Sequence, residues 1–208
     1  AHPWRGGYKY YSLIIRGEYV MFQENIVFYR EWLKLDKREF RVLALLADRG
    51  SFQGNLSDMC RYFSLNPQTS TRNRLHDSIQ KLQEQGFLSC EIKGRNYILQ
   101  AIPKDKEIEM PKEWFKILLQ HDYTSESVSW EAVLKVYLWI LDNKEPVITN
   151  KQIANDLVLS VSTVCSAKNV LEREYHAIER ERITERIGED CFRNLGQEIT
   201  PMAWWSTD

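Results

Sequence analysis

The chain has 208 residues, of which 43% are hydrophobic and 27% are charged, a composition of folded globular proteins and not of disordered ones. It contains no apolar run long enough to cross a membrane, so the sequence predicts no membrane partner. The formal net charge of −1, taken by itself, argues against a nucleic-acid partner.

The first predicted element is a β-hairpin. Residues 8–15 are rich in aromatic and β-branched side chains, Gly17 supplies a turn, and residues 18–22 are strand-like again. We expect this hairpin to be either a flap packed on its own domain or a dimerisation arm. The chain begins at Ala1 without an initiating Met and without the apolar core of a signal peptide, so a missing upstream piece stays open.

A unit of three helices follows the hairpin. Asp36 is the expected N-cap of the first helix, Glu39 is its capping-box partner, and Gly50 is the expected stop. The next predicted elements are a loop, a short helix and a longer helix, at residues 51–54, 56–63 and 68–85.

A second predicted hairpin closes this unit. Residues 90–93 and 97–101 alternate in polarity and flank Gly94, which favours a turn. Three helices followed by a hairpin is the element order of a winged helix. Residues 102–109 are mostly charged and include a proline, which predicts a linker.

The pattern repeats beyond this linker. A shift of 94 residues superimposes apolar positions of the first two helices on later apolar positions. The aligned pairs are Phe40 with Leu134, Leu43 with Tyr137, Leu46 with Ile140, Met59 with Ile153, Cys60 with Ala154 and Thr69 with Thr163. One offset shared by two helices favours two copies of one unit.

The second copy carries the clearest helix-turn-helix pattern, over residues 148–164. Thr149 is a candidate N-cap of its first helix, and Ser160 or Ser162 is a candidate cap of the next. An ordinary helical hairpin in a bundle is the alternative. The predicted elements of this copy are helices at residues 129–144, 150–157 and 162–176 and a hairpin that turns near 188–190.

Both units resemble winged helix-turn-helix domains, and together they cover residues of about 30 to 200. The first unit, LDKREFRVLALL followed by LSDMCRYFSLNPQTSTRNRLHDSIQKLQEQGFL, is similar to N-terminal domains of plasmid and phage replication initiators, and bacterial transcription regulators share its pattern. The resemblance implies a mainly α fold with small β-hairpin wings (α+β), made of two tandem winged helix-turn-helix domains. The expected divisions are an extension over 1–29, domains over 30–103 and 104–208, and a tail with Trp204 and Trp205 packed on its own domain or on a partner.

The first unit is the better candidate for DNA contact. Residues 1–105 hold 16 Lys and Arg against 11 Asp and Glu, a balance of +5, whereas the remaining residues hold 12 against 18, a balance of −6. The start of its third helix lacks acids and carries side chains that read base edges or reach phosphates. These candidates are Gln68, Thr69, Ser70, Thr71, Arg72, Asn73 and Arg74 in the helix, and Lys93, Arg95 and Asn96 in the wing. The alternative is a solvated helix face.

The second unit carries weaker candidates for DNA contact. Its predicted wing alternates Arg with Glu, a pattern typical of paired charges on a strand as much as of a phosphate clamp. Contact with DNA and contact with a protein therefore both stay open. The candidate residues are Ser162, Thr163, Ser166, Lys168 and Asn169 in the helix, and Arg180, Arg182 and Arg186 in the wing.

These patterns predict a sequence-specific protein that binds double-stranded DNA and is not an enzyme. We see no phosphate-binding P-loop and no acid pair of a nuclease, and the singly placed Cys and His predict no metal, no cofactor and reduced thiols in a cytoplasmic protein. The expected role is replication initiation at a plasmid or phage origin. Transcription regulation and a winged-helix scaffold for protein contacts are the alternatives, and a homodimer or a replication protein is an open further partner.

Overall fold

The computed structural model describes residues 11–15, 18–22, 24–120, 127–187 and 192–202. The predicted turns at 16–17 and 188–190, the first residues of the predicted hairpin, and Trp204 and Trp205 lie outside the described residues. In the described part of the chain, no helix is long and apolar enough to cross a membrane.

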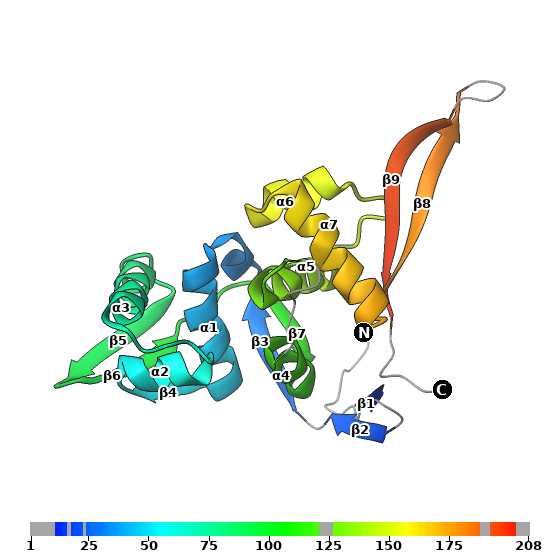
Figure 1. Cartoon of the computed structure of the whole chain (residues 1–208). Coiled ribbons are helices and arrows are strands. Elements are labelled where there is room, and N and C mark those ends of the chain that lie inside the picture. Colours follow the sequence, from blue (N-terminus) through cyan, green and yellow to red (C-terminus); the bar gives the residue numbers. More distant parts are fainter. Residues whose placement is uncertain (1–10, 16–17, 23, 121–126, 188–191, 203–208) are drawn as a thin grey trace, which may run out of the picture.

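Helices and small antiparallel sheets alternate along the chain, so the fold mixes both kinds of element (Figure 1). The first half contains β1 (Tyr11–Ile15), β2 (Glu18–Phe22), β3 (Asn25–Tyr29), η1 (Arg30–Lys34), α1 (Lys37–Arg49), β4 (Ser51–Gly54), α2 (Leu56–Tyr62), α3 (Thr69–Glu84), β5 (Leu88–Lys93) and β6 (Asn96–Ala101). The second half contains β7 (Glu107–Pro111), α4 (Lys112–Gln120), α5 (Trp130–Asp142), α6 (Asn150–Leu157), α7 (Val161–Asn169), η2 (Val170–Glu174), β8 (Ile178–Arg186) and β9 (Phe192–Pro201).

The two halves have the same order of elements. After the β1–β2 pair, the first half continues with a strand and a short helix, β3–η1. The second half begins in the same way with β7–α4, and β3 and β7 pair antiparallel with each other. Three helices and a hairpin follow in each half: α1, α2, α3 and β5–β6, then α5, α6, α7 and β8–β9. In the first half β4 pairs with β6 as a third strand, and in the second half a single bridge from Ile148 to Gln197 takes that place.

Local geometry at the second helix repeats with the offset of 94 residues. Asn55 caps α2 and Thr149 caps α6, each with a complete capping box. Ser64 and Val158, which follow these helices, both have positive φ angles, of 52° and 54°. The offset ends in the next turn, because residues 63–68 join α2 to α3 whereas residues 158–160 join α6 to α7. The predicted match of Thr69 with Thr163 is therefore wrong in structure: the first opens α3 and the second lies further inside α7.

Three predicted boundaries differ from the structure. Residues 51–54, predicted as a loop, form β4, because they pair with the free edge of β6 and Phe52 packs against the core. The predicted linker at 102–109 includes the start of β7, which pairs with β3 inside the predicted N-terminal extension. The predicted helix at 162–176 begins at Val161, where Ser160 caps it, and continues as a π-helix from Val170.

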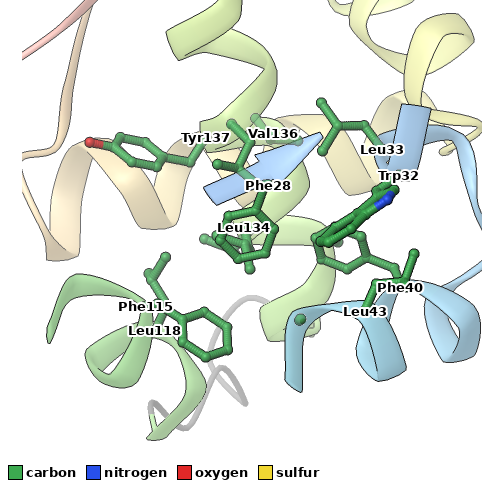
Figure 2. Close-up of a cluster of buried hydrophobic side chains, with 14 of the residues drawn as sticks. Phe28, Trp32, Leu33, Phe40, Leu43, Phe115, Leu118, Leu134, Val136 and Tyr137 are labelled. Carbon is green, nitrogen blue, oxygen red and sulfur yellow. The ribbon is translucent and has the colours of Figure 1, made fainter. Parts of the chain in front are cut away.

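One continuous hydrophobic core joins the two halves (Figure 2). Phe28 of β3 is fully buried, and its ring lies 6.1 Å from the ring of Phe40 in α1 and 5.9 Å from the ring of Phe115 in α4. Leu134 and Val136 of α5 are also fully buried in this cluster. The two halves therefore pack on each other through a shared hydrophobic core.

Charged groups also cross the junction. Glu131 of α5 is 1% exposed and accepts hydrogen bonds from the guanidinium of Arg41 in α1, with the Nε–Oε1 distance at 2.8 Å. The ammonium of Lys135, one turn along α5, donates to the backbone oxygen of Leu35. Removing either partner of the Glu131–Arg41 ion pair would leave an uncompensated charge at the junction of the halves.

Candidate nucleic-acid interface

The N-terminal end of α3 is open and free of acids. Its N-cap, Gln68, makes no side-chain capping bond, and the first turn contains no acidic residue. The helix begins here because Pro67 forces the preceding chain out of helical geometry, and it is held by buried Leu75, Ile79 and Leu82 further along. The exposed amides and positive dipole end of such a helix favour an anionic partner.

A polar hollow of about 560 Å³ lies beside this helix end. α3 contributes Thr69, Arg72 and Asn73, α2 contributes Arg61, and the tip of the β5–β6 hairpin contributes Arg95. In Figure 1 these three elements lie together at one end of the molecule. The structure thus brings together residues that the sequence places in three separate segments.

The hollow has a one-sided charge. Its lining includes three arginines, and no acidic side chain is among the described residues that line it. Arg61 forms an ion pair with Asp58 in the same helix, and its side chain remains 70% exposed. Arginine forks bind phosphates and guanine edges bidentately, so the hollow has the chemistry of a nucleic-acid contact.

The hairpin tip is held against α3 by a hydrogen bond. The hydroxyl of Tyr97 in β6 lies 2.8 Å from Nδ1 of His76 in α3, and burial raises the pKa of this tyrosine. Gly94 occupies the turn with φ at +64°, a conformation open to glycine, and Arg95 follows it at the exposed tip. The bond therefore sets where Arg95 lies relative to Arg72.

The remaining first-half candidates lie around the hollow without lining it. Gln68, Ser70 and Arg74 are exposed and Thr71 is half-buried. Lys93 and Asn96 are exposed in the two hairpin strands, and the ammonium of Lys93 lies 3.2 Å from a carboxylate oxygen of Glu91. The core of the candidate interface is consequently smaller than the predicted set.

The second half does not gather its predicted residues in one site. Lys168 is fully buried and donates to the side chain of Gln197, so it faces the interior and the predicted DNA contact at this residue is wrong. Burial lowers its pKa to about 8. The guanidinium of Arg180 forms an ion pair with Glu172 and donates to Oδ1 of Asn169 at 3.2 Å.

The other predicted residues of the second half are scattered over its surface. The hydroxyls of Ser162 and Thr163 lie 2.8 and 2.7 Å from that of Ser160, the cap of α7, and Ser166 is half-buried. Arg182 and Arg186 are exposed on β8, whose hairpin stands out at the opposite end of the molecule from α3 (Figure 1).

Sequence reasoning missed Arg61 and the α2 contribution to the hollow. Ser57 and Asn55 also line it, and Asn55 is occupied as the cap of α2. The available signal was the exposed basic residue at the end of the helix before the turn, on a helix that packs against α3. Among the described residues, no cluster of His, Cys, Asp or Glu is placed to hold a metal ion.

Comparison of the chain with protein-family models and with curated protein sequences found no match.

Proposed function

We propose that the chain is a sequence-specific double-stranded DNA-binding protein, not an enzyme, built from two tandem winged helix-turn-helix units. The observation that supports this most is the convergence of α3, Arg61 and the β5–β6 tip on one hollow lined by arginines and without acids. Contacts from a helix, its preceding helix and a hairpin tip suit a duplex, which offers a groove and two flanking phosphate backbones.

In this proposal α3 enters the major groove. Arg72 and Asn73 are positioned to read base edges, since Arg pairs bidentately with guanine and Asn with adenine. Thr69 and Arg61 contact phosphates beside the groove. Arg95, at the hairpin tip, reaches the adjacent minor groove, where a narrow width attracts arginine.

Replication initiation at a plasmid or phage origin is the role that the resemblance of the first unit favours, and transcription regulation is the alternative. The genomic neighbourhood distinguishes them. An adjacent array of origin-like repeats supports initiation, whereas a regulated operon with a single operator contradicts it. A homodimer or a replication protein is the further partner in this proposal.

A role in protein contact is a second candidate for the second unit. Val158 and Val161, around the turn into α7, are 73% and 46% exposed, where the first half has the polar Ser64 after α2 and Thr69 at the start of α3. Exposed apolar side chains at this place favour a protein partner over a phosphate backbone. In this arrangement the first unit reads DNA and the second recruits a protein.

Fluorescence anisotropy with a labelled mixed-sequence duplex, titrated over a series of salt concentrations, tests the proposal. We expect binding to weaken steeply with salt, by a log–log slope of roughly −0.9 per phosphate contact. Arg72→Ala and Arg95→Ala should each weaken binding by about 1–3 kcal/mol. Arg38→Ala is the matched control, because it removes the same charge from an exposed site outside the hollow. Absent or salt-independent binding, or equal loss in all three variants, contradicts the proposal and leaves the protein-scaffold alternative.

A further inference from the structure

A second hollow, of about 600 Å³, lies at the junction of the two halves. Lys81 of α3 and Gln85, the C-cap of that helix, form one side, Lys135 of α5 lies on another, and Val158 and Leu159 of the α6–α7 turn complete it. It shares no lining residue with the polar hollow described above. Its volume falls in the range of about 300–1,000 Å³ that is usual for small-molecule sites.

Lys135 is the unusual group in this cavity. It is 2% exposed, its ammonium donates to the backbone oxygen of Leu35, and it lies 5.2 Å from the centre of the Phe40 ring. An ammonium has three donors, so the bond to Leu35 leaves two for further acceptors. Within the described part of the chain no carboxylate forms an ion pair with Lys135 at contact distance.

The nearby carboxylates are already engaged with other groups. Asp36 accepts from the backbone amides of residues 38 and 39, with distances of 2.8 and 2.9 Å. Glu39 pairs with Lys81, and Glu131 pairs with Arg41. The other charged groups at the cavity are Lys34 and Lys37. Burial lowers the pKa of Lys135 to about 8, and Asp36, Glu131 and Glu39 oppose that shift from a distance.

The uncharged lining is part polar, with Gln85, Ser129 and Thr163, and part apolar. Leu35, Ala132, Val158 and Leu159 surround the space next to Lys135. A ligand must therefore combine an apolar body with a hydrogen-bond acceptor for a buried ammonium, since an unpaired buried charge is costly. The lining holds four lysines, Lys34, Lys37, Lys81 and Lys135, against three acids, Asp36, Glu39 and Glu131, a balance of +1 that a monoanion neutralises and a dianionic phosphate exceeds.

We propose that this cavity binds a small organic monocarboxylate with an apolar ring or branched body. Its carboxylate accepts hydrogen bonds from Lys135, and its body packs on Leu35, Ala132 and Leu159. Such a ligand contacts Leu35 of the first half together with α5 and the α6–α7 turn of the second, so it bridges the two halves of the chain. This site stands independently of the proposed DNA binding, because its test contains no DNA.

Isothermal titration calorimetry of the full chain tests the site, with benzoate and cyclohexanecarboxylate as probes and benzyl alcohol and inorganic phosphate as comparisons. We expect both carboxylates to bind at least tenfold more tightly than the alcohol or phosphate. At pH 8 binding should take up protons, measured as a dependence of the heat on buffer ionisation enthalpy, because the bound carboxylate favours the charged form of Lys135.

Two variants and a control separate this site from weak surface binding. Lys135→Met should lower benzoate affinity at least tenfold and abolish proton uptake, and Ala132→Leu should block the cavity without removing any charge. Lys116→Met, at an exposed position of α4 outside the cavity, should leave both unchanged. Circular dichroism checks that each variant is folded, and Ala132→Leu decides the test if Lys135→Met does not fold. The proposal is overturned if the wild-type chain binds neither carboxylate, if alcohol or phosphate binds as tightly, or if the folded cavity variants retain full affinity.

Discussion

Replacement of Val158 should stabilise the protein by relieving backbone strain. It follows α6 with φ at 54° and ψ at 45°, in the left-handed region. That region costs L-residues about 1–2 kcal/mol, and a β-branched side chain is especially ill suited to it. The side chain is 73% exposed, so its removal loses little packing. Asparagine adopts the left-handed conformation more readily at helix ends, so Val158→Asn should raise the free energy of unfolding by about 1 kcal/mol.

Urea and thermal denaturation followed by circular dichroism measure this effect. For a chain of this size a gain of about 1 kcal/mol raises the melting temperature by roughly 2–4 °C. Val161→Asn is the matched control, because Val161 is 46% exposed in the first turn of α7 and has no positive φ angle. The control should be neutral or destabilising. The reasoning is refuted if Val158→Asn lowers stability as much as Val161→Asn does.

Three further changes test the junction and the second hairpin. Glu131→Gln should cost about 3–5 kcal/mol in urea denaturation, because it leaves Arg41 without its charged partner, and a cost similar to that of exposed Glu84→Gln would contradict this. Gly196→Ala should lower the free energy of unfolding by roughly 1–3 kcal/mol, because φ of Gly196 is +148° and an added Cβ would lie 2.9 Å from the backbone oxygen of Ile148. An unchanged melting temperature would be inconsistent with that contact. Burial lowers the pKa of Lys135 to about 8 from 10.5, so between these pH values the folded chain binds fewer protons than the unfolded chain. The free energy of unfolding of the wild type should therefore rise relative to that of Lys135→Met as pH increases from 8 to 10. A difference in unfolding free energy that stays constant over this range would refute the shift.

Features that depend on neighbouring residues were predictable from the sequence. The capping box of Asp36 and Glu39, the stop at Gly50 and the cap of Thr149 are confirmed, since each depends on residues within one turn. The hairpin predicted at 90–101 is confirmed for the same reason, with Gly94 in its turn. Local chemistry determined these elements.

Features that depend on distant contacts were not predictable. β3 and β7 pair although most of the first half of the chain separates them in sequence. Without the partner strand, the composition of residues 102–109 indicates only a charged linker. Lys168 was predicted as a DNA contact in the second unit's helix, yet Gln197 from a distant strand provides its acceptor in the interior. Arg61 joins the candidate interface only because α2 and α3 pack together.

Selection of tight-binding duplexes from a random DNA pool, carried out in parallel with the wild-type chain and Arg72→Ala, tests the central claim most directly. The account predicts that the wild type enriches one sequence motif, and that Arg72→Ala enriches the same motif with its preference relaxed at one or two adjacent positions, because one base contact is lost. Enrichment of no motif by the wild type, or of an identical motif with undiminished preference by Arg72→Ala, would contradict the assignment of α3 as the helix that reads DNA.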